Sequence, residues 1–147
     1  MTPHIPALLE QFRTDGISAT LDGDDDIVFT HNGLSYVLCL DAGDAQFGCL
    51  LLPNVWQVVS PAQAQQALIA LNDINCRLKL VKGVMNENQV SFLIELWFPD
   101  PVAWRYCLVR TRDTLVHAVH LFVDAMQDAA AAQSALQSPL GENNHRA

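Results

Sequence analysis

The dipeptide Asn32-Gly33 stands between two short runs in which apolar and polar residues alternate. A type I′ turn requires positive φ at both central positions, which asparagine and glycine tolerate, so this pattern predicts a β-hairpin. Tight hairpins join antiparallel neighbours, whereas parallel strands need a long crossover connection. The sequence therefore predicts an antiparallel sheet.

Further alternating runs extend this sheet along the chain. Pro53-Asn54 interrupts the longest run, which therefore either lies at an edge of the sheet or carries a bulge. Asn86-Glu87-Asn88 is the expected turn of a second hairpin. Strands are expected near residues 17–21, 27–31, 34–40, 47–58, 77–85 and 89–98.

Three segments have the pattern of helices that cover a sheet. The first has apolar residues at i, i+3, i+4 and i+7 from Ile5, and the other two begin with an N-cap residue followed by proline. We expect helices near 3–14, 61–75 and 101–130. The order α-β-β-β-β-α-β-β-α predicts one α+β domain over residues 1–133, with the helices packed on the sheet. Residues 134–147 are expected to form a frayed or disordered tail.

The charge of the chain excludes several classes of partner. Its 147 residues include 8 Lys+Arg and 16 Asp+Glu, and the formal net charge is -8. Residues 1–75 contain a single base, Arg13, so the negative charge is concentrated there. Nucleic-acid binders need a basic stripe, and anionic membranes attract basic segments. We therefore expect neither a nucleic acid nor a membrane as partner.

The sequence also indicates a cellular compartment. The first residues lack a basic segment followed by a long apolar one, which argues against a signal peptide. No apolar stretch approaches the roughly 18 residues of a membrane-spanning helix. A cytoplasmic location is therefore expected. Cys39, Cys49, Cys76 and Cys107 have no CxxC spacing, and we interpret them as buried free thiols.

Two clusters have the side chains of metal sites. The turn 22–26 is rich in aspartate, but the sixth and twelfth positions of a calcium loop would hold Ile27 and Gly33 instead of glycine and glutamate. We interpret it as a solvated hairpin turn. His117, His120 and Asp124 share one face of the last helix at i, i+3 and i+7, a spacing that suits zinc or iron.

These three side chains point away from the apolar stripe of their helix, and the sequence offers no clear fourth ligand. A solvated face is the preferred interpretation, and a metal-dependent enzyme or ligand-binding protein using His117, His120 and Asp124 is the alternative. The chain contains no GxSxG, P-loop or GxGxxG motif. We therefore expect no enzymatic activity, no cofactor and no metal.

Apolar residues on the outward face of the strands are more informative. In the run 89–98, Phe92 and Ile94 point to the expected core, which leaves Leu93 and Trp97 on the other face. A sheet with two apolar faces needs a second cover, supplied by the last helix, another subunit or a client protein. Trp97 is the first candidate for an interface, and Trp56 is the second. The full set of candidate interface residues is Trp97, Leu93, Val81, Met85 and Trp56.

Residues 71–75 (LNDIN), the strand Val90 to Trp97 and the leucine- and valine-rich last helix together resemble the YbjN family of bacterial proteins. They also resemble the related type III secretion chaperone fold, which includes the CesT/Tir chaperones. The resemblance covers about residues 3–130 and implies an α+β fold, usually homodimeric, with a binding or chaperone-like role. We therefore predict a non-enzymatic protein-binding, accessory or regulatory protein. A structural dimer within a larger assembly is a further alternative.

Overall fold

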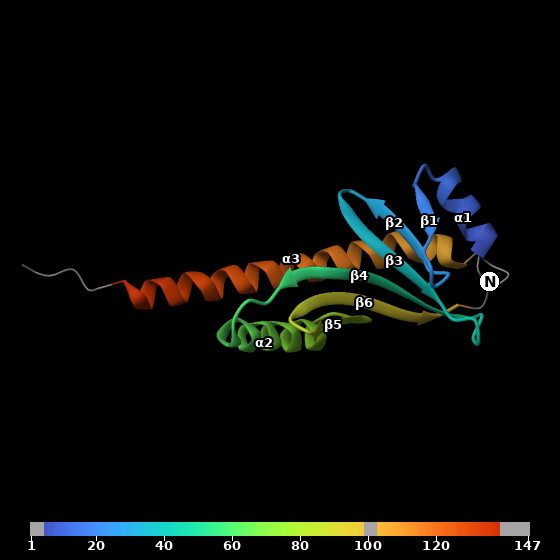
Figure 1. Cartoon of the computed structure of the whole chain (residues 1–147). Helices are drawn as coiled ribbons and strands as arrows, with labels where there is room; N and C mark the ends of the chain where they lie inside the picture. The colour runs from blue at the N-terminus through green and yellow to red at the C-terminus, as the bar shows by residue number, and fades with distance from the viewer. Residues whose placement is uncertain (1–4, 99–102, 139–147) are drawn as a thin grey trace, which may run out of the picture.

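The structure, a computed structural model, describes residues 5–98 and 103–138. These residues form an antiparallel six-stranded sheet with three helices, so the predicted α+β fold and its element order are confirmed (Figure 1). The strand order is β1-β2-β3-β4-β6-β5. The elements are α1 (Ile5–Thr14), β1 (Ala19–Leu21), β2 (Ile27–His31), β3 (Leu34–Leu40), β4 (Phe47–Gln57), α2 (Pro61–Arg77), β5 (Val81–Asn86), β6 (Gln89–Trp97) and α3 (Ala103–Gln137).

The turns form as their residues predict. Asn32 and Gly33 both have positive φ, at 51° and 78°, and join β2 to β3. The interruption at Pro53-Asn54 is a bulge and not an edge, because β4 lies between β3 and β6 and its register shifts between Leu52 and Trp56. Asn54 has a φ of 53°, and its backbone N–H donates to Ser91 Oγ at 3.0 Å.

The core lies on one face of the sheet. Alternate residues of the strands point to this face, and α1, α2 and α3 all contribute their buried side chains to the same cluster. Ser60 caps α2 by accepting a hydrogen bond from Gln63 N. We call the side of the sheet on which the helices pack the inner face. Its buried strand residues are Ile27, Phe29, Tyr36, Leu38, Leu50, Leu52, Val81, Val90, Phe92 and Ile94.

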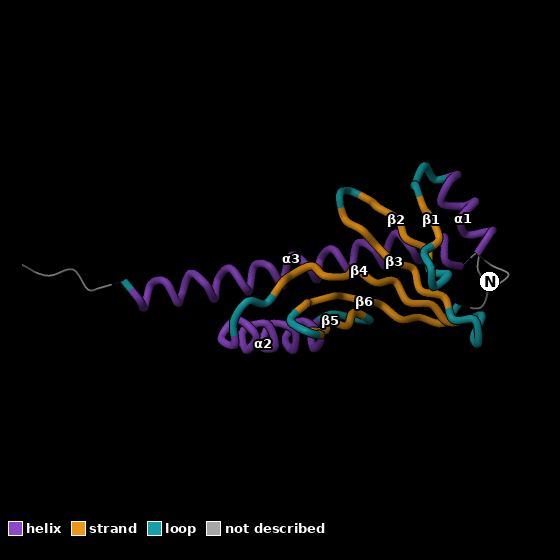
Figure 2. The backbone as a smooth tube through the Cα atoms, viewed as in Figure 1, coloured by secondary structure: helices purple, strands orange, loops and turns teal. Residues whose placement is uncertain are grey.

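The last helix is longer than predicted and extends well past the end of the sheet (Figure 2). Residues 134–137 of the expected tail belong to this helix, and 139–147 lie outside the described residues. The predicted helix starts at 3–4 and 101–102 also lie outside them. No helix in the described ranges is long and apolar enough to cross a membrane.

Candidate protein interface

The second face of the sheet, which we call the outer face, carries a continuous apolar row. Val28 of β2 lies opposite Val37 of β3, Val37 lies opposite Leu51 of β4, and Leu51 lies opposite Leu93 of β6. All four side chains are partly exposed. At one end of β4 and β6, Phe47 pairs with Trp97. The row therefore crosses four adjacent strands without a polar interruption.

No described helix covers the outer face. The row from Val28 to Leu93 is absent from the core cluster, whose helical members all pack on the inner face. Trp97 is 77% exposed, which is unusual for so large an apolar side chain. A contiguous exposed apolar surface of this kind is typical of a protein interaction site. The outer face is therefore the candidate functional site.

The structure places only some of the predicted interface residues there. Leu93 and Trp97 lie on the outer face, as their alternation in β6 predicts. Val81 is buried in the core at 5% exposure, and Met85 packs against the core. The predicted outward placement of both is wrong, because Leu80 adopts a φ of 68° and interrupts the alternation before β5 begins.

Trp56, the second interface candidate, does not lie on the outer face. Trp56 has the same parity in β4 as the inward-facing Leu50 and Leu52, and the irregularity between Leu52 and Trp56 leaves that parity unchanged. On the inner face its ring meets Phe122 of α3 edge to face, with ring centroids 5.9 Å apart. Trp56 therefore supports the packing of α3 on the sheet and does not contribute to the outer face.

Two opposite charges on the outer face form an ion pair. Lys82 of β5 forms an ion pair with Glu95 of β6 on the same face. Glu95 is exposed, as its outward position predicts. A protein that docks here would meet an apolar row with this ion pair on its β6 side and the Asp26 carboxylate near Cys39.

The edge strand β5 is partly closed to strand addition. Asn75 of α2 accepts a hydrogen bond from Gly83 N at 2.7 Å and donates one to Gly83 O at 3.1 Å. One side chain thus satisfies the two backbone groups that an added strand would need at this residue. The face of the sheet is therefore a better candidate for binding than its β5 edge.

The prediction that the four cysteines are buried is wrong. Cys76 is exposed, and Cys39, Cys49 and Cys107 are partly exposed. Cys39 and Cys49 lie directly opposite each other on β3 and β4, on the outer face. Sequence analysis missed this pair, because the strand register that aligns them depends on the geometry of the turn at 41–46.

Leu51 and Phe47 were also missed as candidates. The signal was present, because the run from Phe47 to Val58 is apolar at nearly every position instead of at alternate ones. Such a run indicates a strand with apolar residues on both faces.

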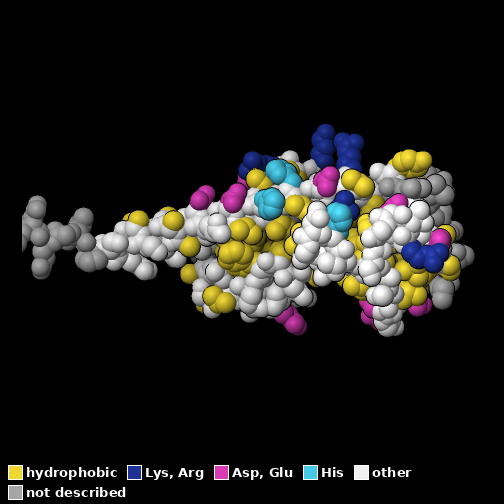
Figure 3. Space-filling view, turned by 90° about the horizontal axis from the view of Figure 1, so that it is seen from above, with side chains coloured by type: hydrophobic (Ala, Val, Ile, Leu, Met, Phe, Trp, Pro, Cys, Tyr) yellow, Lys and Arg dark blue, Asp and Glu magenta, His cyan; other side chains and the backbone are white. Residues whose placement is uncertain are grey.

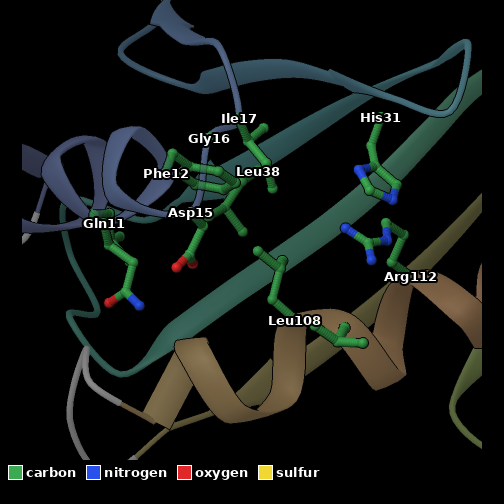
Figure 4. Close-up of a pocket in the computed structure, with 11 residues that line it drawn as sticks. Gln11, Phe12, Asp15, Gly16, Ile17, His31, Leu38, Leu108 and Arg112 are labelled. Atoms are coloured by element: carbon green, nitrogen blue, oxygen red, sulfur yellow. The ribbon is translucent and has the colours of Figure 1, made fainter.

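A cavity of about 490 Å³ lies between α1, β2 and the first turns of α3 (Figure 4). Its walls are largely apolar, while Gln11, Asp15, His31 and Arg112 supply polar groups. His31 and Arg112 lie near each other in Figure 4. The cavity could accept a small molecule with an apolar body and a polar end near Arg112. Its apolar lining residues are Leu8, Phe12, Ile17, Leu38, Leu108 and Val109.

The histidines of α3 line a neighbouring hollow. His117 and His120 are exposed, as predicted, and lie with His31 and Arg112 along this hollow. Figure 3 shows histidine side chains gathered on this side of the molecule. Asp124 is exposed on the same helix. Within the described part of the chain, no three His, Cys, Asp or Glu side chains are arranged to hold a metal ion.

Alanine substitution of His117 or His120 is expected to change the free energy of unfolding by less than about 0.5 kcal/mol, because both side chains are exposed. Urea unfolding of the two variants, with and without added zinc, measures this. A loss of several kcal/mol in the free energy of unfolding would show that these histidines hold a metal. So would stabilisation by zinc that occurs in the unsubstituted protein and not in the variants.

Comparison with known proteins gives information on the fold and not on the function. No family model matches this chain, and no curated protein matches it. A solved structure described as an uncharacterized protein from Methanothermobacter thermautotrophicus is similar, with a TM-score of 0.57 and 14% sequence identity. The match covers 86% of this chain and 98% of that chain. The chain therefore shares its overall architecture with this archaeal protein.

Proposed function

We propose that this chain is a non-enzymatic, protein-binding accessory protein that docks through the outer face of its sheet, and that its first partner is a second copy of itself. The observation that carries the proposal is the uncovered apolar row from Val28 to Leu93, with Trp97 exposed on the same face four residues further along β6. Docking two such faces removes apolar surface from water, which favours association.

Charge supports a second copy as the occupant. The chain has a formal net charge of -8, so two copies repel each other at most surfaces. On the outer face Lys82 and Glu95 neutralise each other, and the row between them and β2 is uncharged. A twofold axis through this face would bring two uncharged apolar rows together.

The resemblance to the YbjN family and to the type III secretion chaperones supports the same proposal. It implies homodimers with binding or chaperone-like roles and no active site. On this proposal the dimer is the resting form, and a client protein would compete for the same apolar surface. We do not propose a metal-dependent activity, because no three His, Cys, Asp or Glu side chains in the described residues are arranged to hold a metal ion.

Trp97→Glu is expected to weaken self-association by at least about 30-fold in Kd, which corresponds to the loss of an aromatic anchor worth about 2 kcal/mol. The fold should remain intact, because Trp97 is 77% exposed in the single chain. Sedimentation velocity over a concentration series measures the association, and far-UV circular dichroism measures the fold.

Tyr106→Glu is the matched control. Tyr106 is an aromatic residue of similar exposure, at 79%, but it lies on α3 and away from the outer face. The control should associate like the unsubstituted protein. A monomeric unsubstituted protein, or a Trp97→Glu variant that remains equally dimeric, would overturn the proposal.

A further inference from the structure

Cys39 and Cys49 are positioned to form a disulfide bond with each other. They are cross-strand partners in the antiparallel pair β3 and β4, and both thiols are free. Directly opposed residues in such a pair have Cα atoms about 4.5–5.5 Å apart. This separation lies within the range of about 4.4–6.8 Å that a disulfide spans. The two strands therefore need little movement to form one.

The two thiols are also chemically unequal. Their mutual hydrogen bond, together with burial, raises the pKa of Cys39. The same hydrogen bond lowers the pKa of Cys49, in spite of its partial burial. Lys82 favours a thiolate at Cys49, while Glu95 and Asp26 oppose it. Cys49 is therefore the sulfur that ionises first, with Cys39 holding the shared proton.

We propose that Cys39 and Cys49 are a reversible dithiol site that exchanges with small disulfides such as oxidised glutathione. The Cys49 thiolate attacks one sulfur of the small disulfide, and the other sulfur leaves as a thiolate. The Cys39 thiol then gives its proton to a thiolate and attacks the Cys49 sulfur, which expels the second small thiol. In total, two protein thiols are oxidised and one small disulfide is reduced to two thiols.

The other cysteines provide the contrast. Cys76 lies on α2 and Cys107 on α3, and neither is opposite another cysteine in the sheet. Each can form a mixed disulfide with a small thiol, but neither has an adjacent thiol to resolve it. The double variant Cys76→Ser/Cys107→Ser therefore isolates the proposed pair without altering either strand.

The experiment equilibrates this double variant of the full chain in glutathione buffers of increasing oxidised fraction, alkylates the remaining thiols and digests the denatured protein. Trypsin cannot separate the two cysteines, because no Lys or Arg lies between Arg13 and Arg77. A protease that cuts before aspartate separates them at Asp41 and Asp44. The peptides that contain Cys39 and Cys49 then remain joined only by the proposed disulfide.

The expected result is a joined peptide pair, lighter than the sum of its parts by two hydrogen atoms, that disappears after reduction. Absence of the joined peptide at equilibrium in excess oxidised glutathione would overturn the proposal.

This inference does not depend on the proposed homodimer. A dimer through the outer face would slow access to both thiols but would not change the equilibrium yield of disulfide in the free chain. Formation of the joined peptide in a monomeric protein would therefore support the dithiol site and contradict the proposed function, and a dimer without the joined peptide would do the reverse.

Discussion

Phe122→Ala is expected to lower the free energy of unfolding by about 3–5 kcal/mol, the range for removing a buried aromatic side chain. Phe122 is fully buried where α3 crosses the inner face. Its ring meets Phe92 of β6 edge to face, with centroids 5.8 Å apart, and it meets Trp56 of β4 in the same way. The substitution would leave a cavity between the long helix and the two central strands.

The matched control is Leu93→Ala on the outer face. Leu93 belongs to the same strand as Phe92 but points away from every described helix. Its truncation should cost about 1 kcal/mol or less in the single chain. Both substitutions are best measured by urea unfolding in the Trp97→Glu background, so that self-association does not add to the stability of the outer face.

This comparison tests the arrangement on which the proposed interface rests. If helices pack on one face only, truncating an inner-face residue lowers the free energy of unfolding much more than truncating an outer-face residue. Similar losses for Phe122→Ala and Leu93→Ala in the monomeric background would mean that both faces are covered within one chain. The outer face would then be a second core and not a surface for a partner.

The fold could be predicted from the sequence because its signals are local. Asn32-Gly33 and the alternating residues around it fix a hairpin, and Ser60-Pro61 fixes the start of α2. Each of these depends on the conformation of a few neighbouring residues. The sheet face of a residue can be read in the same way, but only as long as the strand remains regular.

The candidate site was predicted only in part, because an irregular residue before β5 breaks the alternating pattern. The left-handed backbone of Leu80 displaced Val81 and Met85 from the predicted face. Trp56 lies on the inner face by the same alternation as Leu50 and Leu52, so its candidacy rested on its residue type and not on its position in β4. An alternating pattern does not reveal such a break, since the break changes which face a residue occupies and leaves the sequence pattern intact.

The pairing of Cys39 with Cys49 could not be predicted from the pattern of either strand alone. It depends on which residues of β3 and β4 are opposed, and a shift of one residue would place the two thiols on different rows. The inner face sets this register, because Leu38 of β3 and Leu50 of β4 must both reach the core. Packing on the inner face therefore determines what the outer face presents.

Gly83→Val is expected to lower the free energy of unfolding by about 3 kcal/mol or more, through overpacking and the loss of backbone hydrogen bonds. A Cβ at this position would lie 2.5 Å from Leu71 Cδ2 of α2 and 2.6 Å from Phe92 Cε1 of β6. The Phe92 ring also packs against Phe122 and has little room to move. The strain therefore falls on α2, which would have to move away from β5.

Movement of α2 would also break the two hydrogen bonds between the Asn75 side chain and the Gly83 backbone. Each such bond contributes about 1 kcal/mol, and its loss would expose the β5 edge to other strands. Urea unfolding measures the cost, and light scattering measures any aggregation through the freed edge. Val84→Leu is the control, because the neighbouring side chain points to the open outer face and is 39% exposed. Equal stability of the Gly83→Val and Val84→Leu variants would show that α2 does not pack closely against Gly83 of β5.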